Sequence, residues 1–333
     1  AGQLSPRLHG RVDINKYNNG LKTQKNAYSL PHGGVVRRGG FHYVAGVKGI
    51  PSGAELVANG TFASDITGWT DKTVGSGSSI AHSTNLMNIV SVDASNYGWA
   101  EDEIVTVAGK LYVLSFTIGT GAVNVQIGTT TGAVDILAST SYTAATHTIE
   151  FTALSTATFI GFKHTTGATH TIDTVSVKIA TQDAKIRLAK FEFSVTQAYI
   201  LEFGNLYVRF YKDNGQIQTG GDVVEVVTPY TTAQVPDIYL AQSADTLYIA
   251  HPAHAPRKLT RTSHVAWTLA TLSFATAPAN FVGGAGEYPR SVTFFEERLY
   301  WGGTDNNPQT IWASKSGDFL NMDQGTGLDD ESV

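Results

Sequence analysis

Runs of alternating apolar and polar residues recur through the middle of the chain. In LYVLSFTI (111–118), Tyr112, Leu114, Phe116 and Ile118 share one face of an extended strand. The same period of two occurs in HTIEFTA (147–153) and over residues 174–179, with Gly, Ser, Thr and Asn between the runs. A period of two in several short runs separated by turn residues predicts an antiparallel β-sandwich of short strands.

Two motifs bracket this region. ELVANGTFASDITGWT (55–70) opens it and HTIDTVSVKIA (170–180) closes it, and together they resemble the jelly-roll carbohydrate-binding modules of the galactose-binding-like type over residues 53–181. The resemblance implies a jelly-roll with a structural calcium between the opening loop and the closing strand. Asn59, Thr61 and Asp173 occupy the corresponding positions, with threonine where the family often has an acid. Hard cations prefer carboxylates, so this departure weakens the calcium site, which we place near Asn59 and Asp173. No other cofactor is expected.

Sugar binding by such a module would use aromatic platforms. Trp69, Tyr97 and Trp99 are the candidates, and each has a structural alternative. In the family, the tryptophan at the Gly-Trp position of Trp69 is more often a core residue. Tyr97 and Trp99 stand two apart in an expected strand and share a face, so either role fits them.

The segments on either side of this region form one continuous pattern. FHYVAGVK (41–48) reads as a strand that continues into strands over 184–217 once the middle is removed. We therefore predict a domain insertion, because surface turns tolerate long additions. The predicted parts are residues 1–48 (basic N-terminal arm and first scaffold strands), 49–183 (inserted jelly-roll) and 184–333 (scaffold that continues beyond this sequence).

A loose repeat follows the insertion. Leu-Tyr pairs at 206, 247 and 299 each belong to a strand, a bend and a second strand, at intervals close to those of propeller blades. A single hairpin cannot bury both faces, so such units stack on one another. The predicted fold class is all-β: a β-propeller-like scaffold of short antiparallel sheets with an extended N-terminal arm and an inserted jelly-roll β-sandwich.

Charge is unevenly distributed along the 333 residues. Residues 1–50 carry eight Lys and Arg against Asp13 alone, whereas residues 52–183 carry eleven acidic residues against four lysines. A basic arm beside an acidic module indicates two different surfaces. The absence of cysteine excludes disulfides and thiolate chemistry. No apolar run approaches the roughly 18 residues of a membrane span.

Two arginines stand between glycine pairs in LPHGGVVRRGGFHYV (30–44). Glycine adopts positive φ without strain, so Gly33-Gly34 and Gly39-Gly40 are expected to form two tight bends around a short extended piece. Arg37 and Arg38, with Arg7 and Arg11, would then form a basic assembly arm.

Four segments outside the insertion, in the same order, resemble the tail tubular or nozzle protein of short-tailed bacteriophages, also called a stabilisation or tail hub protein. They are residues 2–44, 191–217, 240–261 and 288–319, and RRGG stands where that family commonly has RRPG. The resemblance implies a virion protein assembled in the host cytoplasm, forming a ring of usually six copies below the portal and adaptor proteins. Such a ring conducts genome DNA and anchors tail fibres or spikes. A channel that passes DNA should not bind it tightly, which favours protein contacts for the arm arginines.

Motifs of catalysis are missing from the sequence, and we expect no enzyme. His251 and His254 on a predicted turn make a poor metal frame, and Glu101-Asp102-Glu103 is interpreted as a solvated acidic run. Asp93 and Glu101 are candidates for a glycosidase pair only if a cleft brings them together. The alternative function is a glycan-binding adhesin that contacts host surface polysaccharide; a depolymerase is the third.

Overall fold

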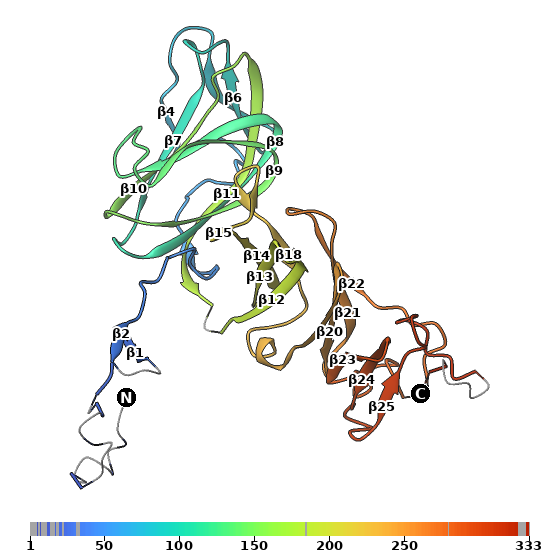
Figure 1. Ribbon diagram of the computed structural model, residues 1–333. Coiled ribbons are helices and arrows are strands. Elements are labelled where there is room, and N and C mark those ends of the chain that lie inside the picture. The colour runs from blue at the N-terminus through green and yellow to red at the C-terminus, as the bar shows by residue number, and fades with distance from the viewer. Residues whose placement is uncertain are drawn as a thin grey trace. The chain divides into compact units, whose positions relative to one another are not determined.

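The computed structural model describes residues 5, 7, 12–13, 17, 20–21, 23–30, 34–183, 185–278, 280–325 and 331–332. It divides into two compact units, residues 1–44 and 45–333. Strands dominate the described residues, which contain no α-helix and one named 3₁₀ turn, η3 (Val235–Asp237). The predicted all-β class is confirmed (Figure 1).

The N-terminal unit contains a small hairpin. β1 (Ala27–Ser29) pairs with β2 (Val35–Arg37), and the Leu30 amide donates to the Gly34 carbonyl. Gly34 has a φ of 84°, as expected for the first bend, while Gly33 lies outside the described residues. The prediction of a second tight bend at Gly39-Gly40 is wrong, because neither glycine adopts positive φ.

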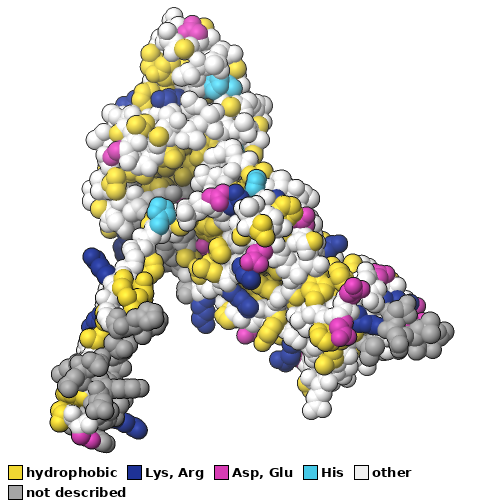
Figure 2. Space-filling view, in the orientation of Figure 1, with side chains coloured by type: hydrophobic (Ala, Val, Ile, Leu, Met, Phe, Trp, Pro, Cys, Tyr) yellow, Lys and Arg dark blue, Asp and Glu magenta, His cyan; other side chains and the backbone are white. Residues whose placement is uncertain are grey.

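The strand expected over residues 41–48 is absent. Phe41 and Tyr43 are 79% and 78% exposed, and no neighbouring strand pairs with them. An alternating pattern forms a strand only where another strand satisfies its backbone groups, and here pairing begins at Gly49. Figure 2 shows hydrophobic side chains at the surface of the N-terminal unit.

Residues 49–183, which we call the central module, form one nine-stranded antiparallel sheet. Its order is β4-β7-β10-β8-β11-β6-β5, with β3 paired to β11 and β9 paired to β8. The strands are β3 (Gly49–Glu55), β4 (Thr70–Asp71), β5 (Ser79–Ser83), β6 (Leu86–Ser91), β7 (Trp99–Val105), β8 (Leu111–Gly128), β9 (Leu137–Thr152), β10 (Ala157–Lys163) and β11 (Ala168–Gln182). The sheet curls until it is nearly closed (Figure 1).

The predicted inward faces of this sheet are confirmed. Leu114, Phe116 and Ile118 of β8 are at most 2% exposed and belong to one core cluster with Ile149 and Val177. The strands are longer than the short ones predicted, because residues 119–121 kink β8 instead of ending it. The register shifts between Ile118 and Ala122 at this point.

The ends of the central module lie together. Gly49 pairs with Gln182, and the Asp183 amide donates to the Lys48 carbonyl at 3.2 Å. The chain therefore enters and leaves this sheet at one point. The domain boundaries themselves stay a prediction.

Three further antiparallel sheets and a small ribbon follow in residues 185–325, which we call the scaffold. The first sheet contains β12 (Arg187–Ser194), β13 (Gln197–Gly204), β14 (Tyr207–Lys212), β15 (Gly215–Gln216) and β18 (Glu225–Val227), beside the ribbon β16 (Gln218–Thr219) and β17 (Asp222–Val223). The second contains β19 (Tyr239–Ser243), β20 (Thr246–His251), β21 (His254–Arg261) and β22 (Trp267–Thr271). The third contains β23 (Ser291–Phe295), β24 (Arg298–Gly302) and β25 (Ile311–Ala313). Tyr207, Leu247–Tyr248 and Leu299–Tyr300 of the three repeats lie in β14, β20 and β24, and each of these strands follows the turn of a hairpin: β13-β14, β19-β20 and β23-β24.

The middle sheet has both faces buried. Leu247 and Ile249 of β20 belong to the core cluster shared with the first sheet, whereas Tyr248 and Ala250 belong to the cluster shared with the third. Successive sheets therefore pack face to face, as blades do. Closure into a ring stays a prediction.

Ion pairs connect the central module to the scaffold. Arg209 of β14 is 6% exposed and donates to Glu150 of β9 at 2.7 Å and to Glu225 of β18 at 2.8 Å. Lys48 pairs with Glu225, and the Gly49 amide donates to Glu150 at 2.8 Å. Because a buried guanidinium needs its carboxylates, this network fixes the module to the first scaffold sheet.

Candidate functional site

Trp69 lies in the core of the central module. Its side chain is 8% exposed and packs between Phe62 and Phe162, with ring centroids 5.7 and 5.6 Å away. Its indole Nε1 donates to the Asn59 carbonyl at 3.0 Å. A sugar cannot stack on a ring whose faces are covered, so Trp69 takes the core role and leaves the list of candidate platforms.

Trp99 and Tyr97 are both partly exposed. Trp99 is the first residue of β7, whereas Tyr97 precedes that strand and forms an isolated bridge with Val74. Ala100 and Ile104 are the core positions on β7. Because successive side chains of a strand point to opposite faces, Trp99 lies on the other, outward face. Trp99 is therefore the platform candidate that the sheet positions best.

A glycine on the next strand makes room for the indole. Gly161 of β10 lies opposite Glu101, two residues along β7 from Trp99. A Cβ at position 161 would lie 3.0 Å from Trp99 Nε1 and 2.9 Å from Cγ of Gln126 on β8. The indole therefore extends over β10 toward β8 at a place where a larger residue would displace it.

Two polar atoms beside Gly161 have no hydrogen-bond partner. They are Trp99 Nε1, a donor, and Gln126 Oε1, an acceptor, and both are shielded from solvent. The Gln126 amide nitrogen donates to the Gly132 carbonyl at 3.2 Å. Buried polar groups are normally paired, so this unpaired donor and acceptor stand out within the module.

Lys163 completes this surface. It lies directly opposite Trp99 in the β10-β7 register and opposite Asn124 in the β10-β8 register. Its Nζ is 5.4 Å from the centroid of the Trp99 ring. Burial lowers the pKa of Lys163, and no carboxylate among the described residues pairs with it. We call Trp99, Asn124, Gln126, Gly161 and Lys163 the Trp99 surface.

The nearby acidic residues do not converge on a catalytic centre. Glu101 is 3% exposed and accepts hydrogen bonds from the Thr131 hydroxyl and, at 2.7 Å, from the Gly132 amide. Asp93 accepts bonds from the Ser95 and Asn96 amides in its own turn. Each carboxylate thus holds a separate loop. The acidic residues 101–103 alternate between the two faces of β7, and Asp102 lies on the same face as the core residues Ala100 and Ile104.

The loop predicted to bind calcium is closed by its own residues. The side-chain amide of Asn59 donates to Asp65 Oδ1 at 2.9 Å. The Asp173 carboxylate accepts a hydrogen bond from the backbone amide of Thr174 at 2.6 Å. The opening loop does lie against the closing strand, because the Val175 amide donates to the Gly60 carbonyl at 2.8 Å. No cluster of three or more His, Asp or Glu suited to a metal occurs among the described residues. The calcium stays a prediction.

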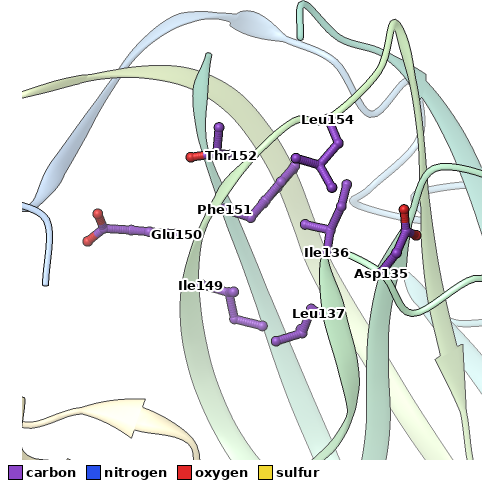
Figure 3. A pocket seen from close by; sticks show the side chains of 8 residues that line it. All are labelled: Asp135, Ile136, Leu137, Ile149, Glu150, Phe151, Thr152 and Leu154. Carbon is purple, nitrogen blue, oxygen red and sulfur yellow. The ribbon is translucent and has the colours of Figure 1, made fainter. Parts of the chain in front are cut away.

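A cavity of about 290 Å³ lies between residues 135–137, where β9 begins, and residues 149–154, where β9 ends. Its wall is mainly apolar, and Figure 3 shows Ile136, Leu137, Ile149 and Phe151 directed at one another while the Glu150 carboxylate points away. Ligand pockets usually combine apolar walls with a few convergent polar groups. This cavity lacks convergent polar groups, and we interpret it as an opening in the apolar core of the module.

The arm arginines are placed in part. Arg7 is exposed, Arg37 ends β2, and the Arg38 guanidinium lies 3.9 Å above the Phe41 ring. Arg11 lies outside the described residues. Arg38 also donates to the Asn26 side chain at 3.3 Å, so it helps to close the hairpin.

His251 and His254 are cross-strand neighbours beside the bend between β20 and β21. Burial lowers the pKa of both. Their rings pack against Tyr230, and His254 Nε2 lies 3.0 Å from Gln234 Oε1. They take part in scaffold packing, and His251 is 4% exposed.

The comparison with solved structures finds similar chains. No family model matches the chain, and no curated protein matches it. A solved structure described as "CBM4 structure and function" is similar at 18% identity and a TM-score of 0.30, covering 37% of this chain and 99% of its own. No helix in the described part of the chain has the length and hydropathy to cross a membrane.

Four members of the Trp99 surface were not found from the sequence. They lie 25 to 64 positions from Trp99 in the chain and meet it only through strand pairing: Asn124, Gln126, Gly161 and Lys163. The available signal was the lysine itself, one of four in an acidic module. Without the register, its place beside Trp99 could not be inferred.

Proposed function

We propose that this chain is a non-enzymatic structural subunit of a phage tail nozzle and that its central module is a glycan-contacting attachment. The nozzle assignment is supported by four segments that resemble that family in order. Three of them coincide with the three successive scaffold sheets, which pack face to face through β20. That shared packing is the observation that carries the proposal.

The N-terminal arm supports assembly as well. Val35, Phe41 and Tyr43 are exposed beside Arg37 and Arg38. A two-stranded hairpin is marginal by itself, so a neighbouring subunit is a suitable partner for it. In this proposal the arm joins one copy to the next in a ring, below portal and adaptor proteins and above fibres or spikes, within the virion.

Electron microscopy of the purified chain tests assembly. We expect rings with a central channel, and we expect Arg37→Glu with Arg38→Glu to release monomers. Lys110→Glu, an equal charge reversal per residue on the exposed surface of the module, is the control and should leave rings intact. A wild-type protein that stays monomeric at all concentrations would contradict the nozzle proposal.

Glycan binding is the second candidate, and the Trp99 surface favours it. Aromatic rings on an outward sheet face beside polar groups suit the apolar faces and hydroxyls of sugars. An array of bacterial surface polysaccharides should retain the wild-type chain and should lose Trp99→Ala. Val105→Ala, at the other end of β7 and 80% exposed, should bind normally. Equal retention of both variants would argue against this surface.

A further inference from the structure

We propose that the Trp99 surface selects acidic glycans, with Lys163 holding a carboxylate of the sugar that stacks on Trp99. This inference rests on the proposed glycan binding and adds the class of ligand. It concerns a cation that the sequence analysis did not assign to any role.

The register places platform and cation side by side. Lys163 pairs with Trp99 across β10 and β7, and its Nζ lies 5.4 Å from the ring centroid. A pyranose ring is comparable in size to the six-membered ring of indole. The Lys163 ammonium lies over the Trp99 ring, so the exocyclic carboxylate of a sugar that packs against this ring would come within reach of the lysine.

Among the residues that the structure describes, the ammonium group of Lys163 contacts the Trp99 ring and pairs with no carboxylate. The nearest acidic position by register is Glu101, whose carboxylate is committed to Thr131 and Gly132. Of the other lysines in the module, Lys178 pairs with Glu55. A partly buried cation without a partner loses hydration, and burial accordingly lowers its pKa. A ligand carboxylate would supply the missing charge.

One accessible polar side chain suits a hydroxyl-bearing ligand. Trp99 Nε1 and Gln126 Oε1 have no partner beside Gly161, but both atoms are shielded from solvent and do not contact a ligand at the surface. Asn124, partly exposed opposite Lys163, offers a side-chain donor and acceptor to sugar hydroxyls. Together the groups recognise a carboxylate and hydroxyls around one aromatic ring.

Two polysaccharides that differ only in charge test the inference. Polygalacturonate carries a carboxylate on every sugar, and its methyl ester has the same rings and linkages without the charge. Affinity electrophoresis of the full chain through gels containing either polymer measures binding. We expect polygalacturonate to be bound at least tenfold more tightly than its ester.

Matched variants identify the residue responsible. Lys163→Gln should reduce binding of polygalacturonate to the level of the ester, while Lys110→Gln, an equal loss of charge on the exposed surface, should change nothing. Trp99→Ala should abolish binding of both polymers. Binding of both polymers with equal affinity by the wild-type chain would overturn the selectivity for acids but leave glycan binding standing. Absence of binding to both polymers and to the polysaccharide array would overturn both proposals.

Discussion

The central module and the scaffold bury their apolar residues in different ways. The module has one core, enclosed by a single sheet that nearly closes on itself. The scaffold has two cores, and β20 contributes alternate residues to each of them. A defect in the module should therefore stay local, whereas a defect in β20 should reach two sheet interfaces. The following predictions test this contrast by calorimetry and tryptophan fluorescence.

Phe116→Ala should have the largest effect. The side chain is fully buried and contacts Tyr142, His147 and Phe162. Loss of a buried phenylalanine costs about 4 kcal/mol, including the cavity. We expect the unfolding transition of the module to move to lower temperature while that of the scaffold stays in place. A shift of both transitions by the same amount would contradict a self-contained core.

Ile249→Ala should destabilise the scaffold by about 3 kcal/mol. Ile249 is fully buried between the first and second sheets, and its neighbours on β20 support the third. The emission of Trp267 and Trp301, which lie in the two different scaffold cores, should change in a single transition. Separate transitions for the two tryptophans would show that the sheets unfold independently.

Arg209→Ala should cost about 2 kcal/mol. Removing one partner of a buried ion pair costs more, about 3 to 5 kcal/mol, but Glu150 and Glu225 keep 23% side-chain exposure and can regain water. The expected result is a wider separation between the module and scaffold transitions. Arg290→Ala removes an exposed pair with Asp305 and should change stability by less than about 0.5 kcal/mol.

Apart from the control Arg290→Ala, Asp102→Asn should give the smallest effect, and its sign should be opposite. Burial raises the pKa of the Asp102 carboxyl to about 6. The folded state then holds a proton that the unfolded state releases, so the stability of the module falls as pH rises from about 4 to about 6. At pH 7 the variant should be more stable by about 1 kcal/mol, allowing for partial exposure to solvent. At pH 4 the two proteins should unfold at the same temperature.

The sequence predicted correctly which residues share one face of a strand, but it predicted poorly which strands pair with one another. The inward face of β8 followed from its period of two, because that pattern reflects burial of one face. The same pattern over residues 41–48 gave a wrong strand prediction, because no strand of the described residues pairs with this segment. Short strands were predicted, but β8 bends at the glycines of residues 119–121 and continues.

The candidate site shows the same limit. Trp99 was found from its residue type and its spacing to Tyr97, and Trp69, which is buried, was found from the Gly-Trp motif. Lys163 and Gly161 could not be found, because cross-strand neighbours depend on a register that a single sequence does not specify. Trp69 and Trp99 differ in exposure for a related reason, since the former is enclosed by aromatic rings from β10 and the opening loop.

The hydrogen bond between the Asp183 amide and the Lys48 carbonyl joins two positions separated by more than a hundred residues. If the central module were removed, a short linker would rejoin the chain, because the peptide groups at Lys48 and Asp183 are already neighbours. The same junction could accept a foreign domain whose own ends are equally close. A domain whose two ends lie together can be exchanged with little change in the path of the flanking chain.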